Sequence, residues 1–269
     1  MSDLENVLRD LAADGDQLDR LVSGLEPSQW QLPTPATGWS IADQIAHLAF
    51  IFKLAKLAAS DAELFQHLIR DAAHDFDGAV NAALADYRDD SPEVLLGRWR
   101  AEREGAVSAL AAVPPDRTVP WLVNPLPPTI LGSAGIMEQF AHGQDIADAL
   151  GTRLERTDRL RYLVIFAVLT RDFGYLARGL TPPAEEFRFE ITAPSGELWA
   201  YGPADAEQRV TGPAEDFCLL VTRRRHRDDL RVTAVGAVAD HWLDIAQAYR
   251  GPAGAGRTPG QFDDLAARA

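Results

Sequence analysis

Apolar side chains recur at helical spacing in four long segments of the first 150 residues, and this periodicity constrains the fold most strongly. Amphipathic helices become stable by burying their apolar faces against one another, so this region is predicted to form an antiparallel four-helix bundle. The segments expected to be helical are residues 3–25, 40–59, 91–110 and 133–150, with residues 61–74 also helical after the second of them.

The predicted ends of these helices carry the residues that satisfy free backbone groups. Ser40 resembles an N-cap, with Asp43 three residues later in the reciprocal capping position. Gly151 is placed to end the fourth helix in the left-handed conformation. Six prolines in residues 114–130 indicate an extended connection, because proline removes a backbone donor and restricts its neighbour.

The pattern changes after residue 180, where alternation of apolar and polar residues replaces helical periodicity. Another helix is expected before this point, at 159–177, and a β-hairpin at 187–201 follows it. The prediction is a small α+β domain made of the hairpin, strands at 209–211 and 230–233, and helices at 213–223 and 237–248. The predicted divisions are a metal-binding helical bundle at 1–180, the α+β domain at 181–251 and a flexible tail at 252–269.

Two of the predicted bundle helices carry residues suited to hold a metal ion. Glu138 and His142 are four residues apart, so they lie on one face of a helix, one turn from each other. His47, from a different helix, is the candidate third ligand. A set of two histidines and one glutamate leaves a coordination position open, as in catalytic zinc sites.

Other interpretations of these residues stay open on sequence alone. A single histidine on an apolar helix face, such as His47, is often only a packed core residue. Two histidines with one carboxylate also suit Fe(II), Ni(II) or Mn(II), although zinc is the expected divalent metal.

Composition restricts the partners and the cellular compartment. Asp and Glu outnumber Lys and Arg by 40 to 26, a net charge of −14 that disfavours nucleic acid and anionic membranes as partners. Cys218 is the single cysteine of the sequence, so an internal disulfide is excluded. Its apolar neighbours predict that it is a core residue. The N-terminus lacks signal-peptide features and no apolar run is long enough to span a bilayer, so a cytoplasmic location is expected.

The segments Trp39–His47 and Glu138–Asp145, followed by an α+β region, resemble the DinB-like superfamily of metal-binding bundles. The most similar branch is that of mycothiol-dependent maleylpyruvate isomerase, and the resemblance covers about residues 3–250. It implies a four-helix bundle that holds zinc through His47, Glu138 and His142, and a C-terminal domain that helps to hold the thiol cofactor mycothiol.

The resemblance also implies a basic residue that binds the thiol, within the arginine run at 223–227. Arg224 and Arg225 are the candidates for this cofactor-binding role. Guanidinium groups pair well with carboxylates, but a run of charges is usually a solvated face, and both interpretations stay open.

Metal-bound thiols lose their proton readily, and this suggests a reaction class. A thiolate can add to a small electrophilic metabolite, giving isomerisation if it later leaves and thiol transfer if it stays. Asp43 and Asp145 are the candidate catalytic residues in an orienting or proton-handling role. Helix capping for Asp43 and a solvated charge for Asp145 are the alternatives.

The sequence thus predicts a zinc-dependent, mycothiol-assisted isomerase or S-transferase whose partners are a small-molecule substrate and a low-molecular-weight thiol. The first alternative is a thiol-independent lyase, isomerase or hydrolase that uses the metal as a Lewis acid. The second is a metal- or ligand-binding module without turnover.

Overall fold

The computed structural model describes residues 3–70, 76–114, 116–122 and 124–263. The chain divides into two compact units, Met1–Leu154 and Glu155–Ala269. This division falls earlier than the boundary at residue 180 that the sequence predicted, because helix α7 (Leu160–Leu169) packs on α9 (Ala214–Val221) of the second unit.

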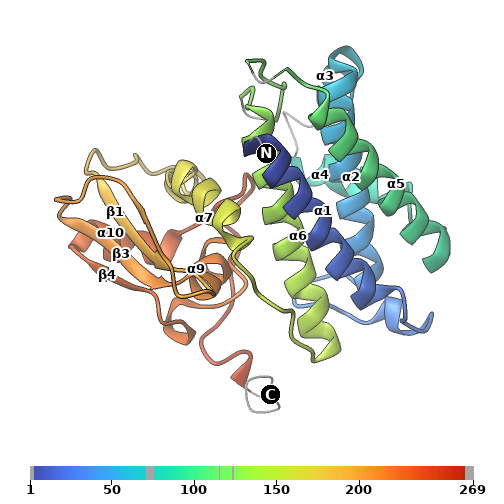
Figure 1. Cartoon of the computed structure of the whole chain (residues 1–269). Coiled ribbons are helices and arrows are strands. Elements are labelled where there is room, and N and C mark those ends of the chain that lie inside the picture. Colours follow the sequence, from blue (N-terminus) through green and yellow to red (C-terminus); the bar gives the residue numbers. More distant parts are fainter. Residues whose placement is uncertain (1–2, 71–75, 115, 123, 264–269) are drawn as a thin grey trace. The chain divides into compact units, whose positions relative to one another are not determined.

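Four long helices pack together in the first unit, as Figure 1 shows. Helix α2 packs along α5, α1 packs along α6, and α2 also contacts α6. Three shorter helices, α3, α4 and η1, lie against α2. The helices of this unit are α1 (Asp3–Val22), η1 (Gln29–Gln31), α2 (Ile41–Ser60), α3 (Ala62–Ile69), α4 (Phe76–Ala85), α5 (Pro92–Ala111) and α6 (Pro128–Leu150).

The expected helix ends at Ser40 and Gly151 are confirmed. The Ser40 side chain and the Asp43 side chain satisfy each other's backbone N–H groups in a capping box at the start of α2. Gly151 ends α6 with a φ of 63°, the left-handed conformation that glycine adopts without strain. Both long helices that carry the candidate ligands are therefore fixed at one end by local sequence.

Several predicted boundaries of the bundle helices are wrong by a few residues. Helix α6 begins at Pro128 rather than at residue 133, since proline is well tolerated in a first helical turn. The segment 61–74 is helical as α3 over Ala62–Ile69, and residues 71–74 lie outside the described part of the chain. Helix α4 was not predicted.

The second unit contains a four-stranded sheet in the order β2-β1-β3-β4. Strands β1 and β2 form the predicted antiparallel hairpin, β3 runs parallel to β1, and β4 is antiparallel to β3. The single helix expected at 159–177 is instead two helices, α7 and α8. The remaining elements are α8 (Phe173–Leu176), β1 (Phe187–Thr192), β2 (Leu198–Tyr201), β3 (Gln208–Pro213), η3 (Arg227–Asp229), β4 (Thr233–Val235) and α10 (Ala237–Ile245).

Aromatic rings fill the core of the second unit. Phe189 of β1 lies edge-on to Phe217 of α9 and to Trp242 of α10, with ring centroids 5.9 and 5.5 Å apart. Cys218, next to Phe217, is fully buried, and this burial raises the pKa of its thiol. The cysteine is therefore a core residue, as expected.

Part of the C-terminal segment contacts the second unit. The Arg225 guanidinium lies 3.8 Å from the centre of the Phe262 ring, and the Gly260 N–H donates to Asp229 at 2.8 Å. Among the described residues, no helix combines the length and the apolarity needed to cross a membrane.

Candidate metal centre

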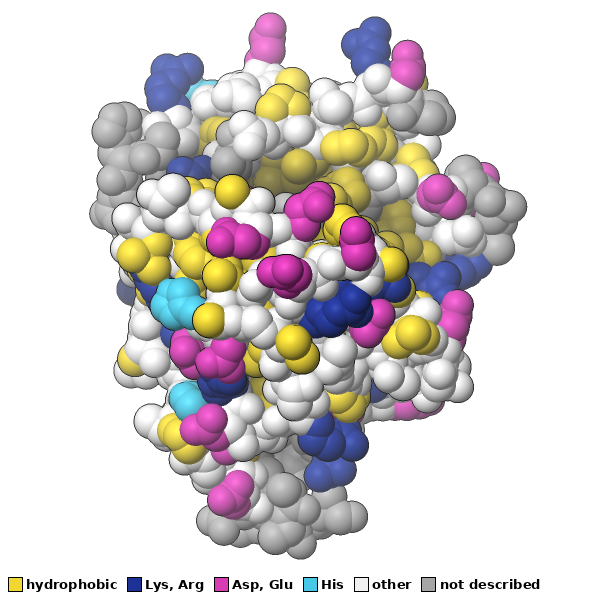
Figure 2. All heavy atoms as spheres, turned by 90° about the vertical axis from the view of Figure 1, so that its left-hand side faces the viewer, with side chains coloured by type: hydrophobic (Ala, Val, Ile, Leu, Met, Phe, Trp, Pro, Cys, Tyr) yellow, Lys and Arg dark blue, Asp and Glu magenta, His cyan; other side chains and the backbone are white. Residues whose placement is uncertain are grey.

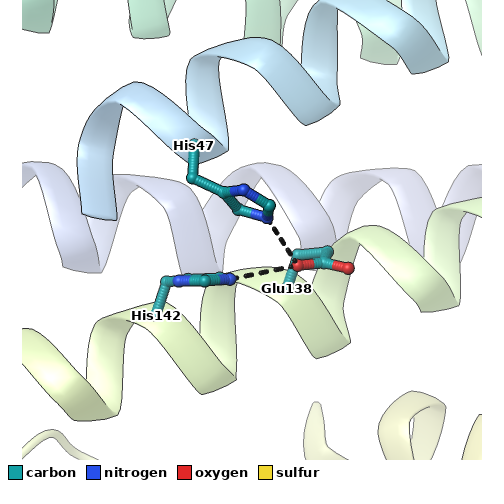
Figure 3. Close-up of side chains that lie close together, drawn as sticks. All are labelled: His47, Glu138 and His142. Carbon is teal, nitrogen blue, oxygen red and sulfur yellow. Dashed lines mark ion pairs between the residues drawn. The ribbon is translucent and has the colours of Figure 1, made fainter. Parts of the chain in front are cut away.

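His47, Glu138 and His142 converge in the interior of the bundle (Figure 3). The Nε2 atoms of His47 and His142 lie 3.5 and 3.3 Å from the same carboxylate oxygen, Oε2 of Glu138. One potential ligand atom from each residue lies within 4.8 Å of the other two. Residues that are far apart in the sequence therefore present three donor atoms to one point.

The backbone of two helices determines this convergence. Glu138 and His142 are one turn apart on α6, and His47 projects from the facing helix α2 (Figure 3). His47 is 8% exposed, and the side chains of Glu138 and His142 are 20% and 12% exposed. The site is mostly shielded, but some of it is open to solvent.

The environment of Glu138 favours its ionised form. Burial alone would raise the pKa of this carboxyl group, but hydrogen bonds and charge from His142 and His47 outweigh that effect. Their combined influence holds the pKa of Glu138 well below its ordinary range. An ionised carboxylate thus faces two imidazole nitrogens.

The Trp39 indole covers the two histidines. It is stacked on His142 with ring centroids 5.9 Å apart and is tilted against His47 at 5.3 Å. Trp39 immediately precedes the N-cap of α2, so the same turn that starts this helix brings the indole over the site.

A buried glutamine binds the remaining nitrogen of His142. The Gln44 Oε1 atom lies 2.5 Å from His142 Nδ1, and the Gln44 Nε2 group donates to the Thr34 hydroxyl at 2.8 Å. The Thr34 hydroxyl in turn donates to the Trp39 carbonyl at 2.9 Å. In contrast, His47 Nδ1 is buried and has no hydrogen-bond partner among the described residues.

Asp43 and Asp145, the candidate catalytic carboxylates, occupy different environments. The Asp43 Oδ2 atom accepts hydrogen bonds from the Ser40 N–H at 2.8 Å and the Ser40 hydroxyl at 2.6 Å, which are the contacts of a helix cap. Asp145 is fully buried, so the alternative interpretation of this residue as a solvated helix charge is wrong.

Arg224 and Arg225 lie in the second unit and bind nearby backbone. Arg224 donates to the Thr222 carbonyl and Arg225 to the Arg224 carbonyl, each at 2.7 Å. Arg227, in the same run, pairs with Asp240 and Asp244. Figure 2 shows acidic and basic side chains interspersed on one face of the protein.

Sequence reasoning identified the three convergent residues but missed Gln44, Thr34 and Trp39 as parts of their surroundings. Gln44 could have been found, because it is a polar residue within the apolar stripe of its helix and lies one turn before His47. Thr34 had no such signal, since its position depends on the loop that precedes α2.

Comparison with known proteins assigns the chain to a family. Residues 11–147, half of the chain, match the family described as mycothiol maleylpyruvate isomerase N-terminal domain. The chain belongs to this family. The match contains all three convergent residues of this mycothiol maleylpyruvate isomerase family member, and it confirms the resemblance inferred from its sequence motifs.

Similar chains exist in Mycobacterium tuberculosis. Proteins described as uncharacterized in strains CDC 1551 / Oshkosh and ATCC 25618 / H37Rv are 45% identical to this family member over 257 residues. The alignment covers 96% of this chain and 100% of theirs. A second family, described as wyosine base formation, matches residues 183–235.

Two solved structures share the fold of this family member. They are crystal structures of the mycothiol-dependent maleylpyruvate isomerase, one of them a variant with a histidine replaced by alanine. Each matches with a TM-score of 0.54, covers 86% of this chain and 92% of its own, and is 17% or 18% identical. The predicted α+β fold, a helical bundle with a small C-terminal α+β region, is thereby confirmed.

Proposed function

We propose that this protein is a zinc-dependent enzyme that uses mycothiol to isomerise a small electrophilic metabolite or to transfer the thiol to it. The observation that carries the proposal is the convergence of His47, Glu138 and His142 in a member of the mycothiol maleylpyruvate isomerase family. The names of the solved relatives supply the thiol and the isomerase class.

The spacing of the three side chains supports a metal ion. In a tetrahedral zinc site with bonds of about 2.0–2.1 Å, neighbouring ligand atoms are roughly 3.3–3.4 Å apart. The two imidazole Nε2 atoms lie 3.3 and 3.5 Å from Glu138 Oε2, close to this value.

The side chains at the candidate metal centre have different roles in this proposal. Glu138, ionised because its pKa is held low, would offset part of the cation's charge, and His47 and His142 would act as neutral donors. When bound, the cation and the thiol would supply a thiolate that adds to an electrophilic carbon, and its later expulsion or retention would give isomerisation or transfer. Trp39 would limit the access of water to the imidazoles.

The other candidate residues have supporting duties in the proposal. Asp145 would orient a ligand or accept a proton from its buried position on α6. Asp43 would act through its cap on the helix that carries His47. Arg224 and Arg225 would pair with an anionic group of the thiol cofactor.

Metal content and thiol binding test the proposal separately. We expect the native protein to contain about one zinc ion per chain by elemental analysis. We expect His142→Ala to lose this metal, while His67→Ala, which removes an exposed histidine of α3, keeps it. Full metal content in His142→Ala would contradict the ligand set.

Calorimetry then distinguishes thiol use from thiol-independent metal chemistry. Mycothiol should bind the zinc-loaded protein more tightly than the metal-free protein, and S-methyl mycothiol, which lacks the ionisable thiol, should lose that preference. Equal binding of the two compounds, or no binding of either, would contradict the thiol mechanism while leaving the metal assignment intact.

A further inference from the structure

We propose that Trp39 is a positioning residue that holds the imidazole rings of His47 and His142 side by side in the metal-free chain. The donor set of the candidate metal centre is then in place before an ion binds. The consequence for metal affinity rests on the proposed function, whereas the packing of the three rings does not. This role differs from shielding the site from water, because it requires a planar ring in a fixed orientation.

The three rings form one closed group. The imidazole centroids of His47 and His142 lie 4.4 Å apart, and the centre of the Trp39 indole lies 5.3 and 5.9 Å from them. Both indole–imidazole separations fall within the range of about 4.5–7 Å that is favourable for aromatic pairs. The two imidazoles project from facing helices (Figure 3), so a single indole restricts side chains of both.

The indole projects from a hydrogen-bonded turn that precedes α2. The Trp39 carbonyl accepts from the Thr34 N–H at 2.8 Å and from the Thr34 hydroxyl at 2.9 Å. The Trp39 N–H donates to the Ala36 carbonyl at 3.0 Å. Gly38, immediately before Trp39, has a φ of 82°, a left-handed conformation that other residues adopt only with strain. These contacts fix the backbone that carries the indole.

The same turn is bonded to the helix that carries His47. The N–H of Ile41, the first residue of α2, donates to the Leu32 carbonyl at 3.1 Å. Further along α2, the Gln44 side chain donates to the Thr34 hydroxyl at 2.8 Å. The turn and the first part of α2 therefore form one hydrogen-bonded unit, which sets the place of the indole relative to His47.

Fixing the imidazoles in advance favours metal binding. A histidine side chain without such packing samples several rotamers, and an ion must then select one of them for each ligand. The indole makes this selection during folding, so less of the binding free energy is lost in ordering the ligands. Loss of the indole should therefore weaken metal binding although all three ligands remain.

Nuclear Overhauser effects in the metal-free full chain test the packing directly. We expect cross-peaks between the indole protons of Trp39 and the carbon-bound imidazole protons of both His47 and His142. The signals are assigned by their loss in Trp39→Phe, His47→Gln and His142→Gln. The absence of cross-peaks to either imidazole in wild type would overturn the proposal.

Two replacements of Trp39 distinguish orientation from shielding. Trp39→Leu keeps an apolar side chain but removes the planar ring, and it should weaken zinc binding about 10- to 100-fold, measured by competition with a chromophoric chelator. Trp39→Phe, which keeps a ring, should restore most of the affinity. Wild-type affinity in Trp39→Leu would overturn the proposal, because an apolar cover would then be sufficient.

Gly38→Ala tests the turn while the indole is retained. The strain of a left-handed alanine should displace the turn, weaken the cross-peaks from Trp39 and lower the zinc affinity. Gly196→Ala is the matched control, because Gly196 has a φ of 90° in the turn between β1 and β2 and, like Gly38, has no atom within 4 Å of an added Cβ. Weakened cross-peaks with unchanged affinity in Gly38→Ala would overturn the proposal, as would an equal loss of affinity in Gly196→Ala.

The results also distinguish this role from the proposed function. If the indole contacts both imidazoles but wild type binds no zinc, the proposed function fails and the packing of the rings stands. If wild type binds zinc and Trp39→Leu binds it equally tightly, the metal assignment stands and the positioning role fails.

Discussion

Asp43 is four residues before the candidate ligand His47 in the sequence, but its carboxylate binds Ser40, the N-cap residue of the same helix. Its Oδ2 atom accepts two hydrogen bonds from Ser40, and the Ser40 hydroxyl accepts from the Asp43 N–H at 3.3 Å. These contacts satisfy free donors at the first turn of α2. A residue engaged in this way supports His47 through the helix rather than through a direct bond.

Replacement of Asp43 by alanine should therefore reduce stability before it reduces metal binding. We expect a loss of about 1 kcal/mol in the free energy of unfolding, measured by urea denaturation, with unchanged zinc affinity. Asp61→Ala is the control. The Asp61 side chain accepts a hydrogen bond from the Leu64 N–H at the start of α3, so this substitution removes a comparable helix cap far from the candidate ligands in sequence. Loss of activity in Asp43→Ala at wild-type stability would instead indicate a direct catalytic role.

The sequence was sufficient to place Glu138 and His142 together, because helical spacing puts them on one face of a single helix. The convergence of His47 could be predicted only from a resemblance, since no local pattern tells which helices face each other. The network through Gln44 and Thr34 was out of reach for the same reason. It joins a loop, a helix start and a second helix, and its geometry exists only after the bundle has packed.

At the scale of helices, α1 and α5 are linked by ion pairs as well as by apolar contacts. Arg100 of α5 donates two hydrogen bonds to the Asp19 carboxylate of α1, at 2.5 and 2.6 Å. Arg103, one turn later, binds Asp16 at 2.8 Å. A hydrogen bond from Arg100 is the main cause of a lowered pKa for Asp19.

Asp19→Asn should destabilise the protein by about 1 kcal/mol or less at pH 7, because the pair is partly exposed. Since folding lowers the pKa of Asp19, its stabilisation is complete above the unfolded value of about 3.9 and is lost as the pH falls through the folded value. Urea denaturation of wild type and variant should thus converge at low pH. Asp10→Asn, which breaks a pair between neighbours on α1, should have little effect at either pH, and a difference that persists in acid would contradict the assignment.

The periodicity of apolar residues predicted the long helices and the hairpin correctly. It predicted the ends of these elements less accurately. The four long helices and the strands at 187–201 were confirmed, because each buries one continuous face. The prediction of one helix over 159–177 is wrong, because the apolar spacing continues across the turn that separates α7 from α8. Strand β4 begins at Thr233, the last residue of the predicted strand, because its pairing with β3 determines its position.

At the scale of the whole molecule, the candidate ligands all belong to the first unit. A ligand that binds only the folded state stabilises that state, by about 4 kcal/mol when its free concentration is 1,000 times its dissociation constant. Local opening of the elements that supply the contacts is suppressed most, because such opening breaks the bonds to the ligand. Metal binding should consequently affect the two units of this chain unequally.

Hydrogen exchange measured by mass spectrometry on the full chain checks this expectation. Addition of zinc should slow exchange in α2 and α6 and leave β1 and β3 little changed. His142→Ala, with zinc present, should exchange like the metal-free protein in both helices. Equal slowing across both units, or none in α2 and α6, would contradict a metal site confined to the bundle.

Because Cys218 is buried, its reactivity can be used to follow the opening of the second unit. A thiol that is shielded from solvent and resists ionisation reacts with alkylating reagents only while its surroundings are transiently open. As this cysteine has no counterpart elsewhere in the sequence, its labelling rate reports the opening of one unit alone. The chain thus carries its own reporter group, on the unit that lacks the candidate ligands.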